Sequence, residues 1–384
     1  MAASLVDRSL MTCKRSSLNG TRHRSRRERS ELPTSIVLLA DDLSGALDSA
    51  SPFRLAGHDV AVAVDTASAA AAMRIDSDVL AINLECRALA ADATAARIRQ
   101  LDQMLVSLAP RLVMLKVDSR LKGPVSAIVE SAMAATGRRE AMVCPAVPDV
   151  GRLVVDSHVT GAGVDRPIPV AGCLPADPAI VCRDAADCVA LRDVAASILR
   201  RPEITLAIGA RGLAQALAEA TARPRPQRAP ADDPPRLPII LAIGSRDPVT
   251  VEQVARLCRA ARLGEQGTAE LEGGAVVLVR PLAADAARHS ADVAAKLADN
   301  VARIVDRCDS ATILASGGDT ALAIARRLGI RVLTPQRELS PGIPLSAAPA
   351  RPELRIATKS GGFGGPDALI DCLAALTRGV ELAA

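Results

Sequence analysis

Short apolar runs that stop at polar residues recur along this chain, and they constrain its fold more than any other feature. Ala-rich stretches of helical character separate them, such as 88–107 and 124–136. An alternation of buried strands and helices is typical of a parallel sheet covered by helices. The sequence therefore predicts an α/β fold. The runs in the first half lie at 35–42, 59–65, 79–85, 112–118 and 140–147.

The second half repeats this alternation, with glycines at the turns between strand and helix. Segment 203–220 already has this strand-Gly-helix form near the end of the first half. We therefore expect a second α/β unit built on the same plan as the first. Strand, turn and helix are expected in 237–261, 311–329 and 353–376, a strand at 274–280 and a helix at 288–308.

A proline-rich segment, 222–238, separates the two halves. It contains six prolines, which neither an ordinary helix nor a central strand tolerates. We interpret it as a stiff, extended linker. The predicted organisation is a basic, disordered tail at 1–35, one domain at 36–221, this linker, and a second domain at 239–384.

The positive net charge of the chain comes from its N-terminal tail. Residues 1–30 hold eight Lys or Arg and two acidic residues, so they carry +6, whereas the whole chain carries +4. The body is therefore slightly acidic, which gives no support for nucleic-acid binding. The tail lacks the apolar core of a secretory signal, and no apolar run is long enough to cross a membrane.

The cysteines and aromatic residues narrow the ligand class. Nine scattered cysteines without a CxxC pattern are typical of reduced thiols in a cytoplasmic protein, and the four histidines form no metal-binding pattern. Phe53 and Phe363 are the only aromatic residues, so no stacking platform for bases is expected. We expect a small polar ligand held by hydrogen bonds and charge, and the oligomeric state stays open, a homo-oligomer included.

Three glycine-rich turns in the second half have the residues that bind phosphate. Free amides and the partial positive charge at the start of a helix attract anions, and glycine lets a phosphate approach the backbone. Lys359 would neutralise phosphate charge, and Asp319 would hold Mg²⁺ or cap its helix. Plain structural turns are the alternative. No P-loop or dinucleotide fingerprint is present. The turns are Gly244-Ser245, Gly317-Gly318-Asp319-Thr320 and Lys359-Ser360-Gly361-Gly362-Phe363-Gly364.

An acidic turn follows the first strand. It contains Asp41, Asp42, Ser44 and Gly45, and Asp48 lies one helical turn further on. Adjacent carboxylates repel each other, so they indicate a polyol, metal or cation nearby. In the alternative, Asp42 or Ser44 caps the helix and Asp41 points to solvent.

Other strand ends in the first half carry charged and polar residues that complement the acidic turn. A cationic cluster opposite paired acids suits a small hydroxylated carboxylate, because Lys or Arg binds the carboxylate and Asp binds the hydroxyls. The residues are Lys116, Asp118, Ser119, Arg120, Lys122 and Arg152.

Taken in order, these motifs resemble those of the four-carbon acid sugar kinase family, which includes D-threonate, D-erythronate and 3-oxo-tetronate kinases. The family's A-D-D-x-T-G-A motif is similar to 40–46, and K-x-D-S-T-x-R-G is similar to 116–123. The match runs in order over nearly the whole body, from about residue 36 to residue 372. Further matching segments lie at 145–152, 209–214, 244–250, 317–320, 341–344 (which contains Gly342) and 359–364.

The resemblance implies two α/β domains with the active site in the cleft between them. The first would bind the sugar acid through the polar residues named above, and the second would bind ATP and Mg²⁺ through the glycine-rich turns and Gly342. Asp41 or Asp42 would orient the attacking hydroxyl and accept its proton. The expected activity is ATP-dependent phosphorylation of a hydroxyl of a four-carbon sugar acid.

Two positions depart from the family pattern. Arg120 stands where the family usually has Thr, and Lys122 where it usually has Arg, and a point charge does not replace a planar guanidinium at a carboxylate site. A non-catalytic sensor of sugar acid or nucleotide is therefore an alternative hypothesis. An NAD-dependent dehydrogenase is a third, which the missing dinucleotide fingerprint disfavours.

Overall fold

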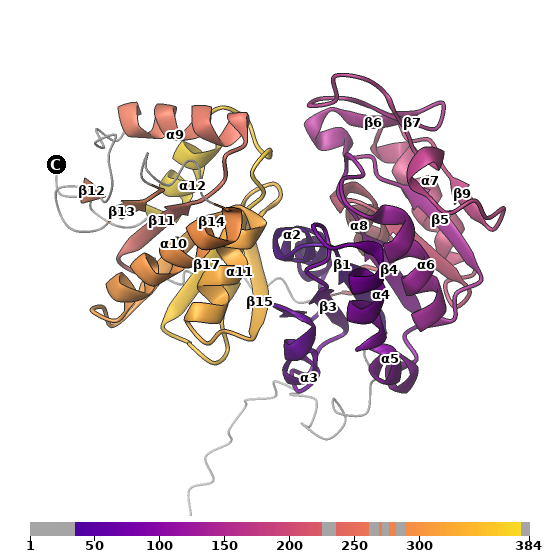
Figure 1. Cartoon of the computed structure of the whole chain (residues 1–384), viewed down its shortest axis with the longest axis horizontal. Helices are drawn as coiled ribbons and strands as arrows, with labels where there is room; N and C mark the ends of the chain where they lie inside the picture. The colour runs from indigo at the N-terminus through magenta and orange to yellow at the C-terminus, as the bar shows by residue number, and fades with distance from the viewer. Residues whose placement is uncertain (1–34, 225–235, 261–268, 271–275, 282–288, 378–384) are drawn as a thin grey trace, which may run out of the picture. The chain divides into compact units, whose positions relative to one another are not determined.

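The computed structural model describes residues 35–224, 236–260, 269–270, 276–281 and 289–377, and it confirms an α/β fold with a large, mostly parallel sheet flanked by helices (Figure 1). Residues 1–34 of the predicted tail and 225–235 of the predicted linker lie outside the described residues. The domain boundaries at 222 and 238 therefore stay a prediction. None of the helices described is long and apolar enough to span a membrane.

The first half of the chain forms a parallel sheet in the order β2-β3-β1-β4-β10-β5-β9. Its strands are β1 (Ile36–Ala40), β2 (Val60–Ala63), β3 (Val79–Asn83), β4 (Leu112–Lys116), β5 (Glu140–Cys144), β9 (Ile180–Cys182) and β10 (Thr205–Gly209). A separate small sheet contains β6 (Arg152–Val155), β7 (His158–Gly161) and β8 (Ile168–Pro169). The helices are α2 (Leu43–Leu55), α3 (Ala69–Ala72), α4 (Ala91–Arg99), α5 (Asp102–Leu108), α6 (Val125–Thr136), α7 (Cys188–Leu199) and α8 (Arg211–Ala220).

The second half has a parallel centre in the order β13-β11-β14-β17, to which β12 and the β15–β16 hairpin add antiparallel pairs. Its strands are β11 (Ile239–Ile243), β12 (Ala269–Glu270), β13 (Val276–Val279), β14 (Ala311–Ser316), β15 (Val332–Ser340), β16 (Ile343–Ala347) and β17 (Leu354–Lys359). Its helices are α9 (Pro248–Ala260), α10 (Ser290–Val305), α11 (Gly318–Arg327) and α12 (Ala368–Thr377).

The two sheets are joined by one short antiparallel pairing between β15 and β2. Val332 pairs with Ala63, and Leu333 pairs with Val62. This pairing joins the two sheets into one sheet of 14 described strands, from which the small β6–β8 sheet stays separate. The apolar runs do not predict this junction, because it depends on a contact between segments about 270 residues apart in the chain.

The strands are buried because helices pack on both sides of the sheet. In the first half α2 packs against α8, and α4 against α6; in the second half α10 packs against α11, and α9 against α12. All five residues of β1 are buried, as are those of β10 and β11, which agrees with the apolar character of these runs.

The register of the parallel strands brings the polar turns to a common edge. The last residue of β1, Ala40, pairs with Asn83 of β3 and with Lys116 of β4. In the other half Ser316 of β14 pairs with Ile243 of β11 and with Lys359 of β17. Since parallel strands all end on the same side, each half presents its polar turns in one row, where ligands of open α/β sheets bind.

Candidate active site

The acidic turn after β1 is held in place by the helix that follows it. Asp42 is the N-cap of α2: one carboxylate oxygen accepts a 2.6 Å bond from the amide of Gly45, and the other accepts a 2.9 Å bond from the Ser44 hydroxyl. The capping alternative is therefore correct for Asp42. The expectation that Asp41 then points to solvent is wrong, because Asp41 is only 1% exposed.

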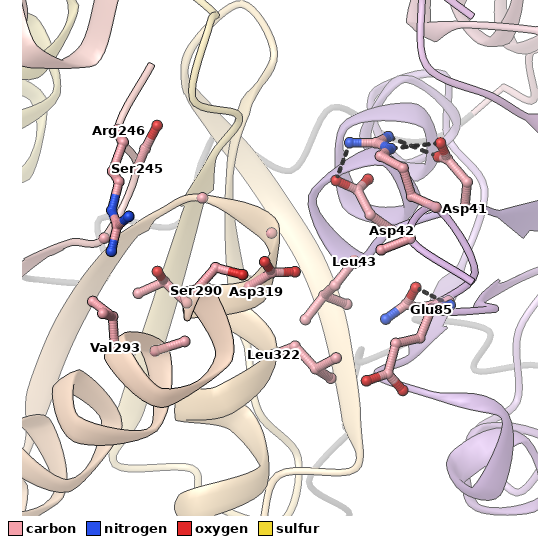
Figure 2. A pocket seen from close by; sticks show the side chains of 18 residues that line it. Asp41, Asp42, Leu43, Glu85, Ser245, Arg246, Ser290, Val293, Asp319 and Leu322 are labelled. Atoms are coloured by element: carbon pink, nitrogen blue, oxygen red, sulfur yellow. Dashed lines mark hydrogen bonds and ion pairs between the residues drawn. The ribbon is translucent and has the colours of Figure 1, made fainter. Parts of the chain in front are cut away.

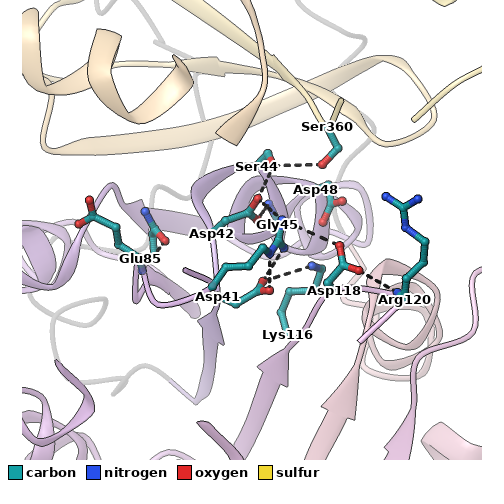
Figure 3. A network of polar contacts seen from close by, with 12 residues as sticks. Asp41, Asp42, Ser44, Gly45, Asp48, Glu85, Lys116, Asp118, Arg120 and Ser360 are labelled. Carbon is teal, nitrogen blue, oxygen red and sulfur yellow. Dashed lines mark hydrogen bonds and ion pairs between the residues drawn. The ribbon is translucent and has the colours of Figure 1, made fainter. Parts of the chain in front are cut away.

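Arg87, which follows β3, binds both carboxylates of the acidic turn. Its guanidinium donates bidentately to Asp41, at 2.7 and 2.9 Å, and to Asp42 at 2.7 Å (Figure 3). Asp118 approaches it at 3.9 Å. A planar, five-donor guanidinium suits such a fork. Arg87 could not be recognised from the sequence, because no motif marks it and only the pairing of β1 with β3 brings it to Asp41.

The charges in this cluster stabilise one another. Burial opposes the charged form of Arg87, but Asp42 and Asp41 outweigh it and raise the pKa of Arg87. Burial likewise opposes the charge on Lys116, while Asp41 and Asp48 raise its pKa. The site therefore holds two permanent cations among its carboxylates at neutral pH.

Lys116, at the end of β4, reaches the acidic turn through the space left by a glycine. Its ammonium lies 3.7 Å from Asp41. A Cβ on Gly45 would lie 2.6 Å from the Lys116 nitrogen and 2.6 Å from Asp42. Any side chain at position 45 would therefore displace the lysine or the cap. Gly45 therefore allows the close approach of Lys116 to the turn, a role that its sequence pattern did not predict.

A second group of cations surrounds the loop after β4. Arg152 donates to the Ser119 hydroxyl at 2.6 Å and to the carbonyl of Ala162. Arg152 is 9% exposed, and within the described residues it forms no ion pair. Burial, with a contribution from neighbouring Arg120, lowers its pKa. A nearly buried cation without an anionic partner is costly unless a ligand supplies the charge.

Arg120 faces the second half of the chain. Its guanidinium lies 3.9 Å from Asp247, at the start of α9, and its amide is bonded to Asp118. Burial works against the charge on Asp118, but Arg87 and Lys116 lower its pKa, so it is ionised. The structure does not bring Lys122 into this group, since its side chain is exposed.

In the second half, the three glycine-rich turns follow three adjacent strands. The amides of Gly244 and Ser245 both donate to the carbonyl of Ser316, and the amide of Gly317 donates to the carbonyl of Lys359. Thr320 is buried and packs against Gly244. The structure therefore brings together the turns that the sequence analysis singled out separately.

The loop 360–365 is fastened through its carbonyl groups. The side-chain amide of Gln253 donates to the carbonyls of Phe363, Gly364 and Gly365. The Thr250 hydroxyl donates to the carbonyl of Gly361. In the described part of the chain, the amides of Gly361, Gly362 and Gly364 donate to no protein oxygen. The loop thus keeps hydrogen-bond donors for a ligand, as phosphate-binding loops do.

Lys359 takes a different position from the one that phosphate neutralisation requires. Its side chain is completely buried, and its ammonium donates to the carbonyls of Ser360 and Gly361. Burial lowers its pKa to about 8. The lysine therefore supports the loop from beneath. On the other side of the loop, Phe363 packs against Gly342 in the turn between β15 and β16.

A pocket of about 390 Å³ lies between the acidic turn and the turns of the second half (Figure 2). From the first half it is lined by Asp41, Asp42, Leu43, Asn83, Glu85, Arg87 and Ala88. From the second half it is lined by Gly244, Ser245, Arg246, Ser290, Val293, Ala294, Leu322 and the turn 317–320. Its size falls within the range of small-molecule sites.

Two contacts join the acidic turn to the turns of the second half. The hydroxyls of Ser44 and Ser360 are 3.0 Å apart. A Cβ on Gly318 would lie 2.8 Å from Asp42, so the start of α11 lies directly against the acidic turn. The predicted nucleotide and substrate residues thus meet at the start of α2.

The comparisons with known proteins follow this division. A model described as a sugar-binding N-terminal domain matches residues 36–171, and one described as a nucleotide-binding C-terminal domain matches residues 268–369. A D-threonate kinase of Bordetella bronchiseptica is 28% identical over 397 residues, which covers 87% of this chain and 96% of the relative. A 3-oxo-tetronate kinase of Methylobacterium radiotolerans is 28% identical and covers 86% and 96%. The chain belongs to the four-carbon acid sugar kinase family.

Solved structures share the fold of this family member. A Salmonella typhimurium protein aligns with a TM-score of 0.66 and 19% identity, covering 88% of this chain and 98% of that chain. A Haemophilus influenzae protein aligns with a TM-score of 0.61 and 17% identity, covering 88% and 99%. These likenesses confirm the predicted α/β architecture.

Proposed function

We propose that this chain is an ATP-dependent kinase that phosphorylates a hydroxyl of a four-carbon sugar acid of the threonate, erythronate or 3-oxo-tetronate type. The observation that carries the proposal is the meeting, at the start of α2, of a cationic, carboxylate-rich cluster with a row of glycine turns that offer free amides. The kinase names of the relatives support it.

The nucleotide phosphates would lie on the second half of the site. The free amides of Gly361, Gly362 and Gly364, the Ser245 hydroxyl and the first amides of α11 would supply donors for phosphate oxygens. Lys359 and Gly342 contribute by holding the loop, the first through its carbonyls and the second through Phe363.

The residues in the pocket suit a magnesium ion carried by the nucleotide. Mg²⁺ in kinases is held mainly by phosphate oxygens and water, with one or two carboxylates. Asp319 is exposed and lines the pocket near Asp42. Within the described residues, no group of three or more metal-binding side chains exists, so any ion would depend on the phosphates. The metal would neutralise charge on the transferred group.

The sugar acid would occupy the first half of the site. In the described part of this half, Arg152 forms no ion pair and Arg120 forms only a 3.9 Å pair with Asp247, so these two cations suit the substrate carboxylate. Ser44, Ser119 and Asp118 provide partners for hydroxyls. Lys122 has no place in this arrangement.

Phosphoryl transfer depends mainly on alignment and charge stabilisation. Arg87 and Lys116 face the developing negative charge, and Asp41 and Asp42 fix the orientation of Arg87. Both oxygens of each of these aspartates already accept contacts from protein groups. Their proposed catalytic contribution is therefore to hold the cations rather than to take a proton.

The test is ADP release by the purified protein with ATP, Mg²⁺ and a panel of four-carbon sugar acids. Stimulation by one acid of the panel is expected. A folded protein that binds ATP but shows no acid-dependent turnover would contradict the proposal and support the sensor alternative. We also propose a cytoplasmic location, since the cysteines that the structure describes are all free thiols.

A further inference from the structure

Asp48 is a buried carboxylate whose contacts are not explained by the packing of α2. It is 8% exposed and lies one helical turn beyond Ser44. One of its oxygens accepts a 2.9 Å bond from the Ser49 hydroxyl. Its other oxygen has no hydrogen-bond partner among the described residues. This oxygen is not among the fully buried unpaired atoms of the described residues, so within an otherwise buried side chain it stays open to a ligand.

The Lys116 ammonium is a hydrogen-bond donor without an acceptor among the described residues, and so complements the unpaired oxygen of Asp48. It is 5% exposed, and its nearest anionic atom is the Asp41 oxygen at 3.7 Å. That distance is too long for a hydrogen bond, and within the described part of the chain the ammonium has no closer acceptor. A free acceptor and a free donor, both more than nine-tenths buried, therefore flank Gly45.

The position of this pair is between the two groups of ligand-binding residues. Residues 44 and 48 are neighbours on one face of α2, about 5–6 Å apart between Cβ atoms, and Ser44 contacts Ser360 of the glycine loop. Figure 3 shows the Asp48 carboxylate on the side of α2 where Asp118 and Arg120 lie. A hydroxyl located there would be near both the sugar acid site and the phosphate site.

We propose that Asp48 accepts the proton of the attacking substrate hydroxyl while Lys116 holds the same oxygen, an inference that rests on the proposed kinase function. The O–H bond breaks and its proton passes to the free oxygen of Asp48. The hydroxyl oxygen then bonds to the γ-phosphorus of ATP. The bond from that phosphorus to the bridging oxygen breaks, and its electron pair leaves on ADP.

The electrostatic environment suits this role. Burial raises the pKa of Asp48 to about 6, with Lys116 on β4, Arg211 on α8 and the Ser49 hydroxyl acting to lower it, and Asp42 acting to raise it. Arg211 is itself paired with Glu338 of β15. A base is most effective when its pKa is near the working pH, so Asp48 is ionised and still basic at pH 7.

The test compares Asp48→Asn with Asp92→Asn, which changes a surface carboxylate in the first turn of α4. For Asp48→Asn we expect kcat to fall by about 100-fold or more, with unchanged affinity for a non-hydrolysable ATP analogue. In the wild type kcat/KM should fall as the pH drops through about 6, and this acid limb should be absent from Asp48→Asn. Asp92→Asn should match the wild type.

A second variant, Ser49→Ala, keeps the carboxylate and removes its hydrogen bond. The loss raises the pKa of Asp48, so the acid limb should move to higher pH while the plateau rate is kept. If Asp48→Asn does not fold, Ser49→Ala alone tests the proposal. The proposal is overturned if kcat/KM of Ser49→Ala falls at the same acidic pH as that of the wild type. An active wild type with an equally active Asp48→Asn variant overturns this inference alone. A wild type without turnover overturns the kinase proposal and the inference with it.

Discussion

Replacement of Arg87 by methionine is expected to destabilise the protein as well as to inactivate it. The guanidinium is the main partner of Asp41, which is 1% exposed and cannot regain its hydration without structural change. Methionine keeps most of the volume of the side chain but provides no charge. The variant therefore leaves a buried carboxylate whose remaining cation, Lys116, is 3.7 Å away.

The structure sets the size of the effect. Removal of one partner from a buried ion pair costs about 3–5 kcal/mol. Because the Arg87 side chain is 30% exposed and Lys116 remains nearby, we expect a loss of about 2–3 kcal/mol, at or just below the lower limit of that range. With an unfolding entropy of about 2.1 cal/mol/K per residue, this loss lowers the Tm of the 384-residue chain by about 3 °C.

Thermal unfolding followed by circular dichroism measures this loss, and Arg97→Met provides the matched control. Arg97 is 26% exposed and pairs with Glu85, a partly exposed carboxylate, at 3.1 Å. Its loss should cost less than about 1 kcal/mol. The double variant Arg87→Met with Asp41→Asn should recover part of the stability, because it also removes the unpaired charge. Equal Tm values for Arg87→Met and Arg97→Met would refute the reasoning.

Three further predictions concern the ligand sites. Gly318→Ala places a Cβ 2.8 Å from Asp42, so kcat/KM in steady-state assays should fall at least about 10-fold; an unchanged value would mean that α11 and the acidic turn do not meet in the working enzyme. Lys359→Met should raise KM for ATP about 10-fold through loss of the loop contacts. In the folded wild type the pKa of this lysine is lowered from 10.5 to about 8, so between these pH values the unfolded state binds more protons than the folded state. The free energy of unfolding of the wild type should therefore rise from pH 8 to pH 10.5, and this rise should be absent from Lys359→Met in denaturation series. Arg152→Gln should raise KM for the sugar acid at least about 10-fold and leave KM for ATP unchanged, and an equal rise in both would contradict a role in carboxylate binding.

The ends of the strands could be predicted from the sequence because a buried strand is apolar and the residues that follow it are polar. Each apolar run stops where the chain leaves the sheet, and the structure ends β1 at Ala40 and β4 at Lys116 as that signal indicates. Parallel pairing then requires the polar turns to share an edge. The fold class therefore predicts that Asp41 and Lys116 share this edge, whereas their 3.7 Å contact depends on the pairing of β1 with β4.

The partners of those residues could not be predicted in the same way. Arg87 lies four residues beyond β3, in a loop with no distinctive composition, and a surface arginine would look identical in sequence. The β15–β16 hairpin was also missed. Pro335 and Pro344 lie inside its strands and argue against a central strand, but the pairing is irregular at Pro335, where a bulge shifts the register.

The direction of the Lys359 side chain also could not be predicted from the sequence. A lysine beside a glycine-rich loop has two options, toward the ligand or toward the carbonyls of the loop. Sequence does not distinguish them, because the choice depends on Thr250 and the helix α9 packed beneath. The pKa of Asp48 depends in the same way on the charge of Lys116, a residue 68 positions further along the chain.

The short pairing of β15 with β2 governs how this protein can be divided. β15 belongs to the second half of the sequence, yet it covers the outer edge of the first sheet at β2. If the chain were cut at the proline-rich segment, β2 and β15 would each lose one of their two neighbouring strands and expose unpaired backbone groups. Such edges recruit strands from other molecules. Separated halves are therefore expected to stick to one another or to copies of themselves, so each half depends on the other for protection against aggregation.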